Sequence, residues 1–295
     1  MSINIITIKF NNIFRSKLWG ASLIVGVASL FYLYEFFLRV APSAMVHELM
    51  RDFAIDASTL GLMSSGFYYA YAIMQIPAGI LCDRYGPKKL LTLAVFICSI
   101  ATIVFANTHN VYTASLSRTA IGMAAAVAFI GPLTLTARWF PLKYFAFVTG
   151  VIQTLGCIGA MVGSEPIAFM VSFYGWRFTL IYCAIAGLCL TFAFIVLIKD
   201  APDKTQLQIR LNSFSLEIRR LCKILKHKQT WWNALMGTNC WTPIAIFELW
   251  GIPYLQQWGH CSTAQAGNAM VMMWLGIAIA SPIAGYYSNK IKLRF

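Results

Sequence analysis

The sequence predicts an all-α fold, that of a polytopic helical membrane protein, and three observations predict it. Of the 295 residues, 59% are hydrophobic and 11% are charged, whereas a soluble domain is roughly 45–50% apolar and about 25% charged. Charge-free stretches as long as a bilayer recur, such as residues 57–82 and 90–117. These stretches stay apolar throughout instead of alternating, which excludes a transmembrane barrel. The composition also excludes a soluble enzyme and a disordered tail.

Eight segments are long enough to cross a bilayer as helices, because about 20 apolar residues suffice and lipid offers the backbone no other partners. They are residues 18–41, 57–82, 90–108, 111–137, 143–170, 177–198, 231–255 and 261–288. The first segment follows three basic residues and continues to Glu35 before its first charge. That apolar run is too long for a cleaved signal peptide, so we expect an uncleaved first span.

The basic residues set the expected topology. Nineteen of the 23 Lys and Arg residues precede span 1, follow span 8, or lie between spans 2 and 3, 4 and 5, or 6 and 7. Only Arg51 and Arg177 lie in the opposite loops. Because Lys and Arg concentrate in cytoplasmic loops, we expect both termini in the cytoplasm of a bacterial cell, with the spans in its inner membrane. The net charge of +13 is then a topology signal, and no nucleic-acid partner is expected.

The long basic loop between spans 6 and 7 divides the chain. We expect a cytoplasmic N-terminus (1–17), a six-helix transmembrane bundle (18–198), a basic cytoplasmic loop (199–230) and the first two spans of a second bundle (231–295). Within the loop, apolar residues recur at helical spacing from Leu211 to Leu225, with basic residues around them. This pattern predicts an amphipathic helix on the cytoplasmic leaflet; a plain basic linker is the alternative.

The second part of the chain echoes the first. Gly61 and Gly79 are 18 residues apart, as are Gly267 and Gly285, and each second glycine comes before a basic turn. Parallel repeats of six spans are a transporter architecture.

The turn between spans 2 and 3 has a physical logic of its own. Gly79 lets another helix approach closely, and Gly86 and Pro87 favour a tight reversal. Asp83 is the single acid among basic residues, and a lone carboxylate suits a facing helix N-terminus or an arginine. A hairpin that carries basic residues only for topology is the alternative.

The turn, G-I-L-C-D-R-Y-G-P-K-K, resembles the signature of the major facilitator superfamily, and the resemblance covers the whole chain. Arg118 and Gly122 resemble that family's R-x-x-x-G motif in span 4. The resemblance implies that Asp83 contacts the start of span 11 and stabilises the outward-facing state. It implies a gating motif made of Gly79, Asp83, Arg84, Gly86, Lys88 and Lys89.

Charged residues inside the spans predict a substrate site. Glu35, Arg118 and Glu248 each lie roughly 9–11 Å below the outer surface, at 1.5 Å per residue. Opposite charges at one depth can pair across a central cavity, and Arg39 shares a helical face with Glu35. We therefore expect Glu35, Arg39, Arg118 and Glu248 to bind substrate. The alternatives are that Arg39 extends to the surface and that Glu165 is only a solvated helix-end residue.

An arginine beside carboxylates suits a small zwitterion or organic anion, and a buried glutamate can carry a coupling proton. We expect proton-coupled secondary transport of an amino acid, dipeptide or organic acid by alternating access, with the lipid bilayer and the solute as partners. Residues 34–43 resemble intraphagosomal amino-acid transporters and the lysosomal dipeptide-transporter branch. The four histidines lack partners at ligand or triad spacing, so no metal, cofactor, catalytic residue or enzyme activity is expected.

The family has twelve spans, and this sequence provides eight. One interpretation is a transporter whose missing spans are supplied by a second chain or lie outside this sequence. The other is a non-transporting remnant, or a regulatory or binding membrane protein. Two spans cannot form the second bundle that alternating access needs, so we expect the chain alone not to transport.

Reporter fusions test the topology. Fusions after Lys17 and after Lys204 should give cytoplasmic signals, because basic residues cluster there. A fusion after Asn107 should give an external signal. The reversed pattern would overturn both the orientation and the alignment of the internal repeat.

Overall fold

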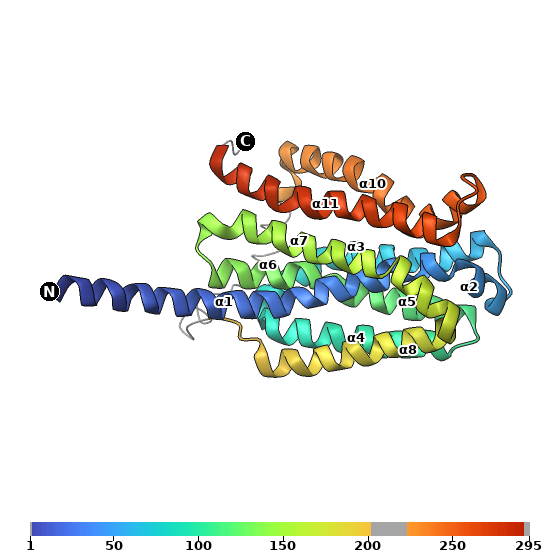
Figure 1. The fold of residues 1–295 in the computed structure, drawn as a ribbon, viewed down its shortest axis with the longest axis horizontal. Coiled ribbons are helices and arrows are strands. Elements are labelled where there is room, and N and C mark those ends of the chain that lie inside the picture. Colours follow the sequence, from blue (N-terminus) through green and yellow to red (C-terminus); the bar gives the residue numbers. More distant parts are fainter. Residues whose placement is uncertain (1, 202–222, 292–295) are drawn as a thin grey trace.

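A computed structural model describes residues 2–201 and 223–291, and within them all regular structure is helical. The elements are α1 (Ser2–Val40), η1 (Ala41–Met45), α2 (Val46–Phe53), α3 (Ala57–Tyr85), α4 (Pro87–Asn107), α5 (Val111–Ala125), α6 (Val127–Trp139), η2 (Leu142–Tyr144), α7 (Phe145–Val162), α8 (Glu165–Leu197), α10 (Lys228–Gln257) and α11 (Thr263–Ile291). The helices run side by side along one long axis (Figure 1). The expected helix at 211–225 falls mostly outside the described residues.

Six segments of the described chain are both long and apolar enough to cross a membrane. They are Trp19–Phe53, Pro87–Asn107, Val111–Trp139, Leu142–Val162, Pro166–Leu197 and Ala264–Tyr287. Helices α3 and α10 have the length, but polar residues such as Gln75 and Asn239 lower their mean hydropathy. Six of the eight expected spans therefore meet both conditions. The crossing of α3 and α10 stays a prediction, favoured by their course along the same bundle (Figure 1).

The fifth and sixth spans differ from the sequence-based expectation. The expected helix at 143–170 ends at Val162, and a new helix begins at Glu165. Pro166 explains the break, because its ring cannot donate the backbone hydrogen bond that would continue α7. The new helix then bends at Gly175, whose positive φ of 76° is readily adopted only by glycine. Uniform apolarity across this region hides both breaks from a hydropathy argument.

The connection after α1 also forms unexpected structure. Residues 42–56 lie between the first two expected spans, yet η1 and α2 fold there. Leu49 and Phe53 are buried, so α2 packs its apolar face onto the bundle. Asp56 then caps α3, because its carboxylate accepts the Thr59 N–H at 2.8 Å. Hydrogen bonds from the Thr59 side chain and from its backbone N–H lower the pKa of Asp56.

Two glycines bring helix backbones into close contact next to the charged residues. A Cβ added at Gly122 of α5 would overlap the backbone of Phe67 in α3, and one added at Gly159 of α7 would overlap the backbone of Leu33 in α1. Small residues permit such approach between membrane helices. The spacing of the R-x-x-x-G motif thus places Arg118 one turn from the point where α5 meets α3.

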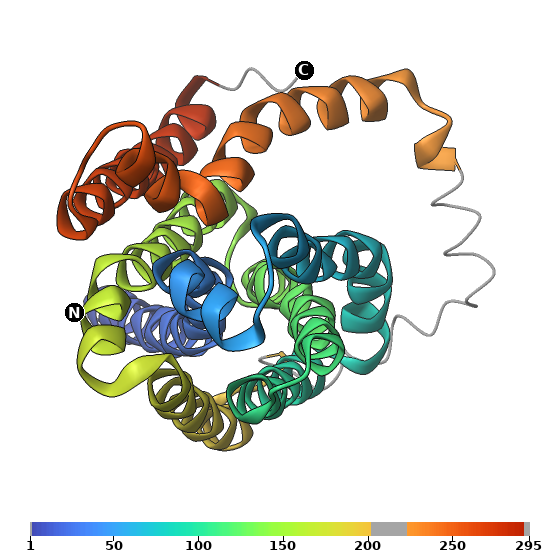
Figure 2. The same ribbon diagram turned by 90° about the vertical axis from the view of Figure 1, so that its right-hand side faces the viewer.

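The last two helices pack differently from the first six. Helix α11 lies against α7, where the Thr154 hydroxyl donates to the Ala278 carbonyl at 2.7 Å. Viewed end-on, α10 runs along the outside of the bundle (Figure 2). Most of its residues from Lys228 to Phe247 are exposed, and burial begins at Glu248. The N-terminal end of α1 and the C-terminal end of α11 point toward the same end of the molecule (Figure 1).

Candidate functional site

Three ionisable side chains meet inside the bundle. Glu35, Arg39 and Glu248, here called the charge cluster, are 0%, 9% and 2% exposed. Arg39 donates to Oε1 of Glu35 through Nε at 2.9 Å and Nη2 at 2.5 Å. Its Nη1 lies 3.8 Å from Oε1 of Glu248. The four-residue spacing on α1 puts Glu35 and Arg39 on one face, as expected, and Arg39 points inward rather than extending to the surface.

Aromatic side chains complete the surroundings of the cluster. The Tyr68 hydroxyl of α3 donates to Oε2 of Glu248 at 3.0 Å. The guanidinium carbon of Arg39 lies 4.4 Å from the ring centroid of Phe36 and 4.7 Å from that of Tyr71. Ring faces attract a cation by their quadrupole. The arginine is therefore held by two carboxylates and by aromatic rings from two helices.

Arg118 has a different partner from the expected one. It is 3% exposed, yet it forms no ion pair within 4 Å among the described residues. Its Nη1 donates to the Leu38 carbonyl at 3.0 Å, and its guanidinium lies 4.9 Å from the Phe67 ring centroid. In a regular helix the Leu38 carbonyl would accept the N–H of residue 42, but that residue is proline. Arg118 supplies the donor that Pro42 lacks, so it fixes the end of α1.

A cavity of about 480 Å³ opens beside the charge cluster. Its lining combines the charges of Arg39 and Glu248 with two amides and several rings: Tyr32, Phe36, Arg39, Tyr68, Tyr71, Gln75, Phe129, Gln153, Trp241, Ala245 and Glu248. At one side, the Tyr32 hydroxyl donates to Oε1 of Gln153 at 2.9 Å. The aromatic residues Tyr32, Tyr68, Tyr71 and Trp241 line it, and Tyr34 does not. The cavity offers an anion-binding donor, hydrogen-bonding amides and apolar walls in one space.

Glu35 stands behind the cavity wall rather than in it. Its Oε1 binds Arg39, and its Oε2 is buried without a hydrogen-bond partner among the described residues. The Nε of Arg118 is buried and unpartnered in the same sense. Such groups are costly and default to functional hypotheses inside a membrane. The side chain of Glu165 lies outside the described set.

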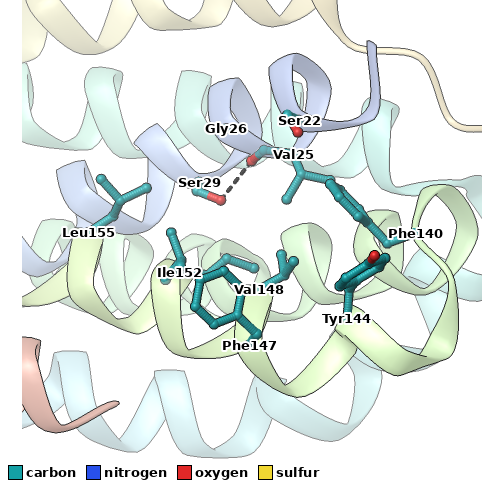
Figure 3. A pocket seen from close by; sticks show the side chains of 11 residues that line it. Ser22, Val25, Gly26, Ser29, Phe140, Tyr144, Phe147, Val148, Ile152 and Leu155 are labelled. Atoms are coloured by element: carbon teal, nitrogen blue, oxygen red, sulfur yellow. Dashed lines mark hydrogen bonds between the residues drawn. The ribbon is translucent and has the colours of Figure 1, made fainter. Parts of the chain in front are cut away.

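A second space of about 380 Å³ lies between α1 and α7 (Figure 3). Ser22, Val25 and Ser29 line it from α1, and Phe147 and Ile152 line it from α7. The Ser29 hydroxyl is turned back to the Val25 carbonyl at 2.6 Å. The lining side chains are apolar, aromatic or hydroxyl-bearing, so this space offers a charged solute no ionic partner.

The loop between α3 and α4 carries the expected gating motif. Gly86 has φ 85° and begins the reversal into α4, as the Gly-Pro pair predicts. The Lys88 backbone N–H donates to Oδ1 of Asp200 at 2.7 Å, and the Lys88 ammonium donates to the Ile195 carbonyl at 2.7 Å. The loop is thereby tied to the end of α8, through an aspartate that motif-based reasoning missed.

The other motif residues face outward. Asp83, Arg84 and Lys89 are exposed, and the Arg84 guanidinium lies 5.6 Å from the Tyr85 ring centroid. The expected close approach of another helix to Gly79 is not seen among the described residues, because no atom of a neighbouring helix lies within 4 Å of a Cβ added there. The gating role of these residues stays a prediction. Across residues 2–201 and 223–291, no group of three His, Cys, Asp or Glu side chains could hold a metal ion.

Comparison with known proteins identifies the family. The sequence model of the Major Facilitator Superfamily matches residues 14–295. Over 190 residues the chain is 29% identical to the probable sulfoacetate transporter of Cupriavidus necator, covering 64% of this chain and 44% of the relative. Over 270 residues it is 27% identical to the probable L-galactonate transporter of Escherichia coli, covering 88% and 58%. The chain spans about half the length of these curated relatives.

A solved structure shares the fold. It is that of a bacterial homologue of the human lysosomal transporter Spinster, in an inward-facing and unoccupied conformation. The TM-score is 0.71 at 17% identity, and the match covers 94% of this chain and 64% of the other. By the match of the sequence model, the chain belongs to the Major Facilitator Superfamily, a family of transporters, and it is a multi-pass membrane protein.

Removing Arg39 should be far more costly than removing a surface arginine. Arg39→Ala leaves two carboxylates buried without their counter-charge, and breaking such a group costs about 3–5 kcal/mol of unfolding free energy. Arg51→Ala is the matched control, because Arg51 is 76% exposed and, among the described residues, pairs only with Asp52; it should cost about 0–1 kcal/mol. Unfolding of the purified variants in detergent, compared with the wild type, measures both. Equal small losses would show that the charge cluster is not buried as described.

Proposed function

We propose that this chain is the substrate-binding part of a secondary transporter for a small organic anion, working by alternating access. The observation that carries the proposal is Arg39 at the wall of the cavity, held by Glu35 behind it and lying 3.8 Å from Glu248, which lines the same cavity. A planar guanidinium is suited to gripping a carboxylate or sulfonate. Sulfoacetate and L-galactonate, named for the two relatives, both carry such groups.

The remaining lining favours a polar solute with some apolar surface. Gln75 and Gln153 present amides for hydroxyl groups, while Phe129 and Trp241 supply flat apolar walls. We keep Arg118 among the proposed binding residues, because its buried Nε has no hydrogen-bond partner among the described residues. A second candidate is a zwitterion such as an amino acid or dipeptide, since Glu248 could receive an ammonium group in the same cavity.

Glu35 is the proposed carrier of a coupling proton. Its carboxylate is fully buried, contacts Arg39 directly, and keeps one oxygen without a partner among the described residues. Protonation would weaken its attraction for Arg39 and so change how strongly Arg39 attracts a solute anion. Proton uptake and anion binding would be linked through one arginine.

The proposal includes the setting of the transporter. Both termini and the loop 199–230 face the cytoplasm, and the membrane is a bacterial inner membrane, because the basic residues gather on one side. The gating motif moves with the six-helix bundle 18–198, while 231–295 begins the second bundle. The alternative function is a non-transporting remnant or a regulatory membrane protein; a second chain could supply further spans.

Uptake into proteoliposomes under an inward proton gradient tests the function. The 295-residue chain is offered labelled L-galactonate and sulfoacetate. If it transports, Arg39→Lys should lower uptake at least about tenfold, because the two-pronged grip is lost. Glu35→Gln should abolish gradient-driven accumulation while binding persists. Binding without uptake is the result expected of the chain alone, because two spans cannot form the second bundle. Binding of neither anion would contradict the proposal, and accumulation by Glu35→Gln would remove that residue from the proton role.

A further inference from the structure

Glu248 joins α10 to the six-helix bundle through two different helices. One carboxylate oxygen faces Arg39 of α1 at 3.8 Å, and the other accepts the Tyr68 hydroxyl of α3 at 3.0 Å. The residue is 2% exposed, whereas most of α10 before it is exposed. Figure 2 shows that this earlier part of α10 runs away from the bundle. Leu249, Gly251 and Ile252 of α10 are buried as well, and Glu248 adds polar contacts with α1 and α3 to this apolar packing.

The two groups that face Glu248 are also the groups that a solute anion needs. Arg39 and Tyr68 both line the cavity. Arg39 is bound more closely to Glu35, at 2.5 and 2.9 Å, than to Glu248, where the separation exceeds hydrogen-bonding distance. The interaction of Arg39 with Glu248 is therefore weaker than its interaction with Glu35. Glu248 is also the partner that lines the cavity, whereas Glu35 does not.

We propose that Glu248 occupies the anion site of the cavity when no solute is bound, and that the carboxylate or sulfonate of the solute displaces it from Arg39 and Tyr68. This inference rests on the proposed function as an anion transporter. Displacement breaks the polar links from α10 to α1 and α3, so solute binding releases α10 for movement. A solute can shift a conformational equilibrium only through such a difference in contacts between the two states.

Binding of L-galactonate and of sulfoacetate to purified wild-type and Glu248→Gln proteins tests the competition. The amide keeps the shape and can still accept the Tyr68 hydroxyl, but it loses the charge that attracts Arg39. The Kd of the bound anion should fall about tenfold, at the low end of what close charge pairs contribute. Glu48→Gln is the matched control, since it removes one negative charge from α2, outside the cavity lining; its Kd should equal that of the wild type.

A proximity measurement separates displacement from a simple change in local charge. A Cβ at Gly61 of α3 would lie 3.5 Å from Trp250 of α10, so cysteines at these two positions, in a chain without its other cysteines, report on the α3–α10 contact. Saturating L-galactonate or sulfoacetate should slow their cross-linking at least threefold, and Glu248→Gln should show slow cross-linking without any anion.

Each outcome decides a different question. Tighter binding by Glu248→Gln together with anion-dependent loss of cross-linking supports displacement. Unchanged or weaker anion binding by Glu248→Gln overturns the inference and leaves the proposed function standing. A cross-linking rate that stays the same when an anion is bound does so too. If neither anion binds to the wild type or to the variant, the proposed anion function fails, and the inference fails with it.

Discussion

The burial of Arg39 is the constraint on which the rest of the site depends. A cation inside a membrane protein is tolerated only with counter-charges and hydrogen bonds around it. Glu35 on the same helix supplies the close partner, Glu248 on α10 supplies the distant one, and the faces of Phe36 and Tyr71 add attraction. The contacts that stabilise this one guanidinium thus bring α1, α3 and α10 together around the cavity.

Close backbone packing makes this arrangement rigid on the side of the first six helices. Gly122 lets α5 approach α3 at Phe67, and the ring of Phe67 in turn lies under Arg118. Arg118 then binds the Leu38 carbonyl that Pro42 leaves without a backbone donor. The hydrogen bond from Arg118 of α5 therefore fixes the end of α1. Arg39 directly follows Leu38 in this helix, so its position is fixed as well. The α10 side has no comparable support in the described residues before Glu248, which is where movement is expected.

Composition predicts the helical membrane class, and helical periodicity predicts that Glu35 and Arg39 share a face. The family was predicted from a resemblance, that of the turn between spans 2 and 3 to a known signature. Sequence reasoning could not predict the partner of Arg118. The depth of a residue along a span does not show which way its side chain points around the helix. The acceptor of Arg118 is the Leu38 carbonyl, which lacks its usual backbone donor because Pro42 follows four residues later. The hydrogen bond from Tyr68 to Glu248 could not be predicted either, because it joins residues 180 positions apart. Asp200 was missed because its role, binding the Lys88 N–H, depends on how α8 ends beside α4. The boundary at Val162 was misplaced because apolarity continues across it.

The central claim is that Arg39 and Glu248 interact across the boundary between the six-helix bundle and α10. A double-mutant cycle measures this interaction directly, from the unfolding free energies of the wild type, Arg39→Gln, Glu248→Gln and the double variant. The account predicts a coupling of about 1–3 kcal/mol, as expected for residues in one buried charge network. Additive effects, within about 0.3–0.5 kcal/mol, would show that the two charges do not interact and would contradict the account.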